Sequence, residues 1–307
     1  MVERTPSDPN LILDMAQIAE ESGLDSLWVG DSLTAKPRLE PLATLGAVAA
    51  STKRVRLGTA VLLAALRHPV LLTQTINTLD LISNGRMVLA VGAGGSFTRE
   101  QKDEWRIAGV DAAQRGRRLE EVMQVVKLLS TGPTTSFHGQ HFQLQDISVL
   151  PKSVQATGVP ILFACHMRAK KNIQFQRVAR WGDGYISISE TPKEFYTAGK
   201  KIEEYAASYG RDLHKMERVF YMTVNINRDS VRARKEADAF LKLYYGLNIW
   251  QDTWGPWGNP EQLVQSIRQY SQAGATTIII RLASFEPIKQ LKLLLHEVIP
   301  SIHYNCC

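Results

Sequence analysis

The sequence has little cysteine and few apolar residues near its start. Its 307 residues include three cysteines, Cys165 and the adjacent Cys306 and Cys307, and no C-x-x-C pair. This set supports neither a disulfide framework nor a zinc motif, which favours a reduced intracellular chain. Residues 1–10 are polar and contain two prolines, so the apolar centre of a signal peptide is missing. We therefore expect a cytoplasmic protein.

Long apolar runs, metal-binding clusters and a basic stripe are also missing. No run approaches the ~18 apolar residues that a membrane-spanning helix needs. His138 and His141 lie three residues apart without acidic or thiol partners nearby, so no metal site is predicted. Lys and Arg exceed Asp and Glu, 36 against 30, but they are spread thinly and without interleaved aromatic residues. We expect neither nucleic acid nor membrane as a partner. The excess charge reflects either solvated helix faces or attraction to an anionic ligand such as a phosphate.

What the sequence does contain is an alternation of short apolar runs and longer amphipathic segments. The apolar runs predict strands at Ser26–Gly30, Val55–Leu63, Met87–Gly92, Val159–Ala164, Tyr185–Ser189, Val219–Ile226 and Thr276–Leu282. The amphipathic segments predict helices that include Pro9–Ser22, Pro41–Thr52, Pro69–Ser83, Arg168–Trp181, Thr191–Tyr209, Ser230–Tyr245, Asn259–Ala273 and Pro287–Ile302. Nearly all the strands are continuous apolar runs, as in parallel strands covered on both faces, and their alternation with helices indicates βαβ units.

This alternation predicts the α/β class and, within it, a (β/α)8 TIM barrel that uses residues 1–307 as one domain. Residues 132–151 and 246–258 are expected as insertion loops, and the second holds three tryptophans. Seven strands are recognisable, whereas a barrel has eight. The first strand would have to lie in Met1–Thr5, which carries two charges, so it is expected to be short or missing. An open doubly wound sheet is the structural alternative.

A glycine-rich turn follows the third of these strands. Gly92–Phe97 begins like the G-x-G-x-x-G dinucleotide motif, but Phe97 replaces the third glycine. A helical pattern follows the turn, where a dinucleotide-binding fold requires a second strand. We therefore interpret the turn as a strand end at which the backbone approaches a ring or a phosphate closely.

The segment Ala164–Lys171 runs from the end of a strand into the predicted start of a helix. Unpaired N–H groups at a helix N-terminus bind anions, and Arg168 and Lys170 would add positive charge. An ordinary surface loop with basic residues explains the same pattern, and both interpretations stay open. His166 lies at a strand's C-terminal end, where barrel enzymes carry their active sites. Cys165, inside an apolar run, is typical of a small buried side chain.

Several stretches, taken together, resemble the luciferase-like monooxygenase family. The matching pieces are AEESGLDSLWVGD (Ala19–Asp31), RVRLGTAVL (Arg54–Leu62), RHP (Arg67–Pro69), TLDLISNGRMVLAVGAGG (Thr78–Gly95), RVARWGDGYI (Arg177–Ile186) and NPEQLVQSIRQYSQAGATTIII (Asn259–Ile280). Each piece alone is a weak signal, whereas the combination is specific and spans most of the chain.

The resemblance implies a (β/α) barrel that binds FMN or the deazaflavin F420 at the C-terminal ends of its strands. Our leading hypothesis is a monooxygenase that uses reduced FMN and O2 on a small organic substrate. It would receive reduced flavin from a separate reductase and would form a homodimer. One alternative is an F420-dependent reductase or dehydrogenase that transfers hydride. Another is a non-catalytic flavin-binding homologue.

The resemblance also implies a set of site residues. The cofactor-binding candidates include a cis peptide behind the flavin ring, residues that flank the ring, and a phosphate-binding strand end, namely Asp31, Ala60, Val61, Gly94, Thr98, Cys165, His166 and Arg168. The catalytic candidates are Asp31, Ser32 and His166. Many family members carry a proton-transferring histidine where this chain has Ser32. A serine needs an activating partner to act as a base near neutral pH, so the usual proton transfer is in doubt.

Overall fold

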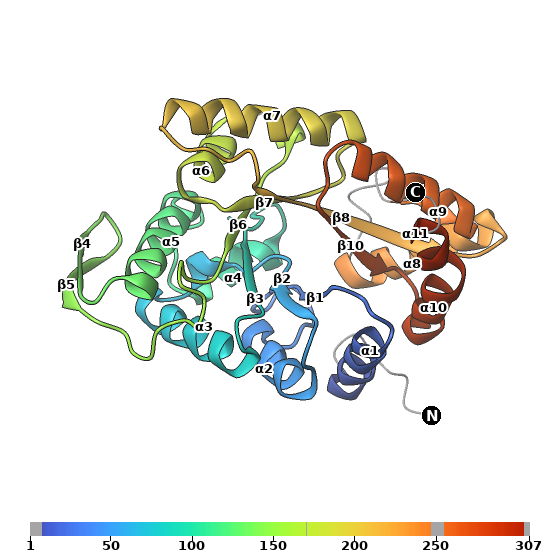
Figure 1. Cartoon of the computed structure of the whole chain (residues 1–307), viewed down its shortest axis with the longest axis horizontal. Helices are drawn as coiled ribbons and strands as arrows, with labels where there is room; N and C mark the ends of the chain where they lie inside the picture. Colours follow the sequence, from blue (N-terminus) through green and yellow to red (C-terminus); the bar gives the residue numbers. More distant parts are fainter. Residues whose placement is uncertain (1–7, 170, 247–254, 304–307) are drawn as a thin grey trace. The chain divides into compact units, whose positions relative to one another are not determined.

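The computed structural model describes residues 8–169, 171–246 and 255–303. The chain divides into two compact units. The N-terminal unit comprises Met1–Ala164 and Arg180–Asp183, and the C-terminal unit comprises Cys165–Ala179 and Gly184–Cys307. Both units are built from parallel strands and flanking helices (Figure 1).

The N-terminal unit has a parallel sheet in the order β1-β2-β3-β6. Its strands are β1 (Ser26–Val29), β2 (Arg56–Thr59), β3 (Met87–Val91) and β6 (Ile161–Ala164). Its helices are α1 (Pro9–Glu21), α2 (Pro41–Ser51), α3 (Pro69–Ser83), α4 (Arg99–Ile107) and α5 (Arg115–Thr131), with the 3-10 turn η1 (Ala64–Leu66). Every residue of β3 is buried, as expected for a strand covered on both faces.

Consecutive helices of the N-terminal unit pack on one another. α1 contacts α2, α2 contacts α3, and α3 contacts α5. Local sequence sets the helix ends. Asp8 caps α1 with Pro9 in the first position, and Asn84 ends α3 in the left-handed conformation, with a φ of 57°. The antiparallel hairpin of β4 (Thr135–His138) and β5 (Gln143–Ile147) packs on α5 through Phe137, Leu144 and Ile147.

The C-terminal unit has parallel strands in the order β7-β8-β10, with the short β9 against the end of β8. The strands are β7 (Gly184–Ile188), β8 (Glu217–Ile226), β9 (Trp257–Gly258) and β10 (Thr277–Leu282). The helices are α6 (Ile173–Trp181), α7 (Pro192–Ser208), α8 (Ser230–Tyr245), α9 (Pro260–Gln272), α10 (Pro287–Leu293) and α11 (Ile299–His303). A 3-10 turn η2 (Met167–Ala169) and a π-helical turn η4 (Leu294–Val298) complete the unit.

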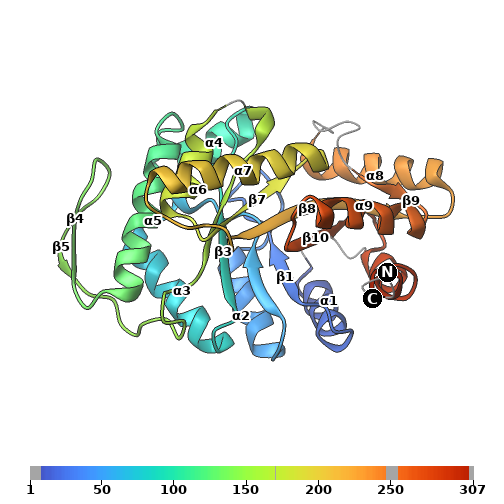
Figure 2. The same cartoon turned by 45° about the horizontal axis from the view of Figure 1, so that its top comes forward.

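Helices cover both faces of the sheet in the C-terminal unit. On one face, Phe220 of β8 stacks on Tyr270 of α9, with ring centroids 3.7 Å apart, and meets the edge of Phe195 of α7. Figure 2 shows α7 and α9 beside β8. On the other face, Ile188 and Ala283 pack against apolar residues of α8. Burial on both sides explains why these strands are continuous apolar runs in the sequence.

The predicted strands are all present among the described residues, as β1, β2, β3, β6, β7, β8 and β10. Residues 132–151 contain the β4–β5 hairpin. The expected short strand before Pro9 and most of residues 246–258 lie outside the described residues. The organisation of the chain as a single domain stays a prediction.

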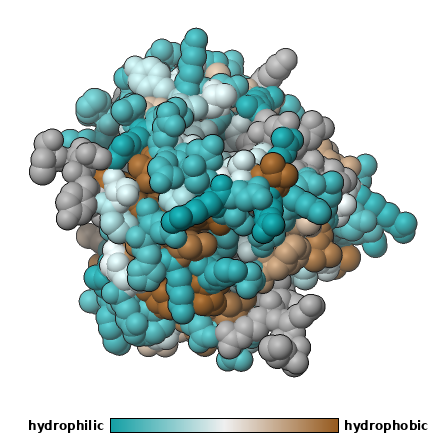
Figure 3. All heavy atoms as spheres, turned by 90° about the vertical axis from the view of Figure 1, so that its right-hand side faces the viewer, coloured by the Kyte–Doolittle hydropathy of each residue, from teal (hydrophilic) through white to brown (hydrophobic). Residues whose placement is uncertain are grey.

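The surface of the described residues carries both hydrophilic and apolar side chains. No helix among them combines the length and apolar character of a membrane-spanning segment. Figure 3 shows one face of the molecule, on which apolar side chains form small patches among hydrophilic ones. Large apolar side chains that are more than half exposed include Leu71, Phe97, Leu150 and Val231. Separate exposed apolar residues are usual on folded proteins.

Candidate active site

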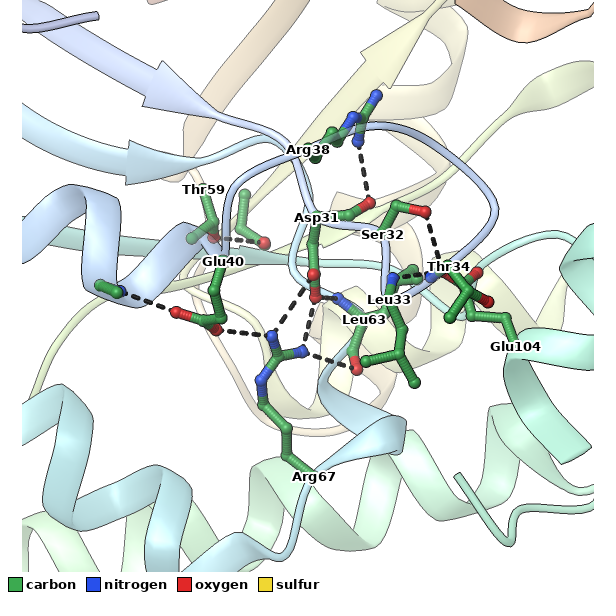
Figure 4. A network of polar contacts seen from close by, with 12 residues as sticks. Asp31, Ser32, Leu33, Thr34, Arg38, Glu40, Thr59, Leu63, Arg67 and Glu104 are labelled. Atoms are coloured by element: carbon green, nitrogen blue, oxygen red, sulfur yellow. Dashed lines mark hydrogen bonds and ion pairs between the residues drawn. The ribbon is translucent and has the colours of Figure 1, made fainter. Parts of the chain in front are cut away.

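Asp31 lies two residues after the end of β1, and its carboxylate is buried. Oδ2 accepts hydrogen bonds from the Leu63 backbone N–H at 2.9 Å and from Arg67 Nη1 at 2.5 Å, and Oδ1 accepts from Arg67 Nη2 at 3.3 Å. Arg67 also donates to Glu40 at 2.8 Å (Figure 4). Burial by itself would lower the pKa of Arg67, but the two carboxylates outweigh it and raise that pKa. The Asp31 carboxylate therefore ties the segment after β1 to the segment after β2.

Ser32, the next residue, binds a carboxylate from helix α4. Its Oγ donates to Glu104 Oε1 at 2.8 Å, and both side chains are buried. The same oxygen accepts the backbone N–H groups of Leu33, of Thr34 at 3.0 Å and of Ala35 at 3.4 Å (Figure 4). None of the described residues donates to Glu104 Oε2. One carboxylate oxygen is thus fixed by the loop after β1, and the other is available to a further partner.

The segment after β2 presents a small accessible apolar surface. The peptide bond between Ala60 and Val61 is cis, as the family resemblance implied. Both residues are partly exposed, whereas residues 57–59 before them and 62–65 after them are buried. Ala60 and Val61 are therefore the part of this segment that a ligand can touch.

The glycine-rich turn after β3 is required by close packing within the protein. A Cβ on Gly92 would lie 2.6 Å from Val61 Cγ2, and one on Gly94 would lie 2.8 Å from the Trp105 ring. Gly94 also has a φ of 69°, a conformation that favours glycine. Thr98 caps the N-terminus of α4, the helix that carries Trp105. Contacts with protein side chains therefore account for these two glycines, and no bound ring or phosphate is needed to explain them.

A second polar group lies in the C-terminal unit, where the chain leaves β6. Cys165 is fully buried, and burial together with the nearby Glu190 carboxylate raises the pKa of its thiol, which makes it unreactive. Gln174 of α6 holds the backbone of His166. The His166 N–H donates to Oε1 at 2.8 Å, and Gln174 Nε2 donates to the His166 carbonyl at 2.6 Å. His166 Nδ1 lies 3.4 Å from Glu190 Oε1, and the His166 side chain is 34% exposed.

Glu190 lies two residues after the end of β7 and organises this loop. Its buried carboxylate accepts the Met167 backbone N–H at 3.2 Å and the Ser187 hydroxyl. The Tyr270 hydroxyl donates to the Glu190 carbonyl. Burial, reinforced by the charge of Glu190, raises the pKa of Tyr270 to about 12, so this hydroxyl stays protonated at ordinary pH.

The helix predicted to begin at Arg168 begins only at Ile173, and Met167–Ala169 form the turn η2. The prediction is wrong because the N–H groups of His166 and Met167 bind side chains of α6 and of the β7 end, and the chain turns there instead of starting a helix. Arg168 Nη2 lies 3.4 Å from Glu194 Oε2 in a partly exposed pair. An anion bound here would therefore contact side chains of the loop, because the helix N-terminus that was expected to bind it lies further along the chain.

Comparison with known proteins assigns the chain to a family. The profile described as luciferase-like monooxygenase matches residues 2–247. The chain belongs to this family. Among curated proteins, this luciferase-like chain is 28% identical to the F420-dependent glucose-6-phosphate dehydrogenase of Amycolatopsis mediterranei (strain U-32) over an alignment of 327 positions. That alignment covers 96% of this chain and 95% of the relative.

Solved structures share the fold of this luciferase-like chain over nearly its whole length. The monooxygenase RslO1 from Streptomyces bottropensis aligns with a TM-score of 0.82 at 21% identity, covering 97% of this chain and 95% of that one. An F420-dependent secondary alcohol dehydrogenase, solved with an F420–acetone adduct, also gives a TM-score of 0.82 at 21% identity and covers 97% of this chain and 96% of that one. These similarities confirm the predicted luciferase-like (β/α) barrel over the open doubly wound alternative. The prediction that the protein is a flavin-type oxidoreductase is confirmed.

The predicted site residues of this luciferase-like chain fall into two groups. In the N-terminal unit, Asp31 and Gly94 both meet Leu63, the first through a hydrogen bond and the second through close packing. Leu63 lies two residues after the cis peptide bond, so these positions form one neighbourhood, with Ser32 beside them. Thr98, the N-cap of α4, lies in the same unit, and the C-terminal unit contains Cys165, His166 and Arg168. The catalytic and cofactor-binding roles of both groups stay predictions.

Four polar residues that organise these groups were not predicted from the sequence, namely Arg67, Glu104, Gln174 and Glu190. Glu190 could have been found, because it comes directly after a predicted strand, where a barrel carries its site. Glu104 gave no such signal, because it lies on a strongly polar helix 72 residues from Ser32 along the chain.

Proposed function

We propose that this enzyme is an F420-dependent oxidoreductase that moves a hydride between the deazaflavin and a small organic substrate. The proposal is supported by the similarity to an F420-dependent dehydrogenase along almost the whole chain. The structural observation that carries it is the buried Glu104 carboxylate, one oxygen of which is held by four donors. A fixed carboxylate suits a reaction in which a proton accompanies each hydride.

The residues of the N-terminal unit fit an aromatic cofactor ring. Ala60 and Val61 offer apolar surface to a ring in a segment that is otherwise buried. Asp31 and Arg67 hold the adjoining turn at Leu63, so this surface is set in place before a ligand arrives. When bound, F420 supplies a two-electron hydride acceptor or donor, and the protein supplies position and proton transfer.

Glu104 is the proposed proton acceptor. Oxidation of an alcohol removes a hydride from carbon and a proton from oxygen, and the proton needs a base within hydrogen-bond reach. The loop after β1 holds Glu104 Oε1, whereas Oε2 accepts no donor from the described residues. Ser32 acts as a positioning residue, since its hydroxyl already donates to Glu104. In the reverse reaction Glu104 returns the proton to the substrate oxygen.

Anaerobic titration with F420 and with FMN, followed by absorbance and fluorescence, tests the cofactor. We expect F420 to bind in the micromolar range or tighter, and F420 reduction to proceed without O2 when a panel of alcohols and aldoses is supplied. Glu104→Gln should bind F420 like the unchanged enzyme and lose turnover. Binding of FMN alone, or turnover that requires O2, would contradict the proposal.

A reduced-FMN monooxygenase is the second candidate. It is favoured by the fold similarity to a monooxygenase, which equals the similarity to the F420-dependent alcohol dehydrogenase. This enzyme would need a separate flavin reductase as a partner. Oxygen uptake coupled to substrate, measured with photoreduced FMN in an oxygen electrode, separates the two candidates.

We also propose that the enzyme works as a homodimer in the cytoplasm, with a small molecule as substrate. The reduced cysteines expected from the sequence and the buried Cys165 support the location. Light scattering coupled to size exclusion measures the assembly, and a mass equal to one chain at micromolar concentration would contradict the dimer.

A further inference from the structure

Two large apolar side chains are exposed at strand ends of the N-terminal unit. Leu33, in the loop after β1, is 52% exposed, and Phe97, in the turn after β3, is 83% exposed. The exposed leucines Leu71, Leu81 and Leu128 lie instead on the helices α3 and α5. Barrel enzymes carry their active sites at the C-terminal ends of the strands, so the place of Leu33 and Phe97 links their exposure to a substrate.

Both residues are tied to the helix that carries Glu104. The Leu33 backbone N–H donates to Glu104 Oε1, which places Leu33 next to this carboxylate (Figure 4). The Phe97 backbone N–H donates to Gln101 Oε1 at 2.9 Å. Gln101 and Glu104 are three residues apart on α4, so their side chains are neighbours on one face of the helix. Leu33 and Phe97 therefore flank the Glu104 carboxylate from two separate loops.

Further hydrogen bonds hold the turn that carries Phe97. Trp105 Nε1 donates to the Gly95 carbonyl at 2.8 Å, and Arg115 Nε donates to the Gly94 carbonyl at 3.2 Å. Both donors belong to helices, α4 and α5 respectively. The Phe97 ring is thus exposed on a backbone that the protein fixes, which suits a side chain that contacts a ligand.

The charges around Glu104 disfavour an anionic substrate. Its buried carboxylate contacts no basic side chain of the described residues. Two basic residues of the loop after β1 have other partners, since Arg38 donates to the Asp31 carbonyl at 2.8 Å and Lys36 interacts electrostatically with Glu100. A phosphate or a carboxylate brought to Glu104 would therefore be repelled by a charge of the same sign.

We propose that Leu33 and Phe97 determine substrate specificity by contacting an apolar group next to the reacting carbon. The substrate is then an uncharged alcohol with a hydrocarbon group, or the corresponding carbonyl compound. Contact of this group with the two side chains adds binding energy that a polyhydroxylated compound does not gain. The inference rests on the proposed function, because it assumes that Glu104 accepts the proton of the alcohol.

Anaerobic steady-state kinetics of F420 reduction test the inference with three probes. Cyclohexanol is an uncharged alcohol with a hydrocarbon ring, glucose is uncharged and polyhydroxylated, and glucose 6-phosphate is polyhydroxylated and anionic. We expect kcat/KM to fall in this order. The step from cyclohexanol to glucose reports the apolar contact, and the step from glucose to glucose 6-phosphate reports the charge.

Leu33→Ser and Phe97→Ser should each lower kcat/KM for cyclohexanol about tenfold, because each variant removes an apolar contact. The Kd for F420 and kcat/KM for glucose should stay unchanged. Leu33→Lys should raise kcat/KM for glucose 6-phosphate, since a cation then lies next to Glu104. Both side chains are exposed, so the variants are expected to fold. Val231→Ser, at a position of α8 that is 75% exposed, is the matched control and should change none of these values.

The outcomes separate the two proposals. If glucose 6-phosphate is oxidised with a higher kcat/KM than cyclohexanol, the specificity inference is overturned and the proposed function stands. The same conclusion follows if the serine variants change nothing, or if they lower kcat/KM equally for cyclohexanol and glucose. If the unchanged enzyme binds no F420, or reduces it with none of the probes, both proposals are overturned.

Discussion

Two buried carboxylates, Asp31 in the N-terminal unit and Glu190 in the C-terminal unit, occupy equivalent places and are paired differently. Each lies two residues after the end of a parallel strand and accepts a backbone N–H, from Leu63 and Met167 respectively. Asp31 is paired with an arginine through two contacts, whereas Glu190 faces a histidine through one contact of 3.4 Å.

The difference between these pairs lies in how firmly the basic side chain is held. A guanidinium stays charged at every pH at which the protein folds, so the Asp31 pair is a permanent structural tie. The His166 ring makes one contact of 3.4 Å with Glu190 and its side chain is 34% exposed, so the Glu190 pair is open to a ligand. We expect substitutions around Asp31 to act on stability regardless of pH and those around Glu190 to act on binding.

Arg67→Met should give the largest effect. Removing one partner of a buried ion pair leaves an uncompensated charge, and we expect the free energy of unfolding to fall by about 3 kcal/mol. Urea denaturation at pH 6 and at pH 8 should give the same loss. Arg106→Met, which removes an exposed arginine of α4 paired with Asp103, is the matched control and should cost less than about 1 kcal/mol. A loss that differs strongly between the two pH values would break the comparison.

Glu104→Gln tests another buried carboxylate, which contacts no basic side chain of the described residues. The amide keeps an acceptor for Ser32 but cannot take a proton, so kcat should fall by about 100-fold while the Kd for F420 changes little. Steady-state kinetics with the best substrate of the panel measures this. Glu100→Gln, in the exposed first turn of the same helix, should leave kcat unchanged. An equal loss in both variants would argue against a catalytic role for Glu104.

Alkaline pH should destabilise the C-terminal unit through Cys165. Burial and then the charge of Glu190 raise the pKa of this thiol above its value in the unfolded chain. The folded state therefore keeps a proton that the unfolded state loses. The stabilisation is complete below about pH 8.5 and decreases above it, by about 2 kcal/mol at pH 10. Urea denaturation from pH 7 to pH 10 should show a smaller decrease for Cys165→Ala, and parallel curves would contradict the prediction.

Ser32→Ala should give the smallest effect. The variant loses one hydrogen bond to Glu104, but three backbone donors remain, so the free energy of unfolding should fall by about 1 kcal/mol. If Ser32 only positions Glu104, kcat should fall a few-fold, far less than in Glu104→Gln. Ser51→Ala, which removes a hydroxyl bonded within α2, is the control for stability. A loss of kcat as large as that of Glu104→Gln would assign Ser32 a direct part in proton transfer.

The fold was predictable from the sequence because each of its signals is local. Apolar runs of strand length, amphipathic segments and caps such as Asp8 and Asn84 act over a few residues, and the structure contains the seven strands that they predict. The helix start at Arg168 was mispredicted because long-range contacts with Glu190 and Gln174 decide the path of the chain there. The short helix α4 was not delimited, since its mostly charged sequence gives no apolar face to detect.

The sequence by itself determined the strand ends at which functional residues could lie, which pointed to His166, and its resemblance to the luciferase-like family added Asp31 and Ser32. Only the tertiary structure decided which partners those residues have, because Arg67, Glu104 and Glu190 are brought to them across 36, 72 and about 24 residues of chain. A side chain's chemistry depends on the charge and hydrogen bonds around it, and these are set by packing. The strand ends follow from local apolar patterns, whereas the distinction between the two-contact pair at Asp31 and the single, partly exposed contact at Glu190 exists only in the folded chain.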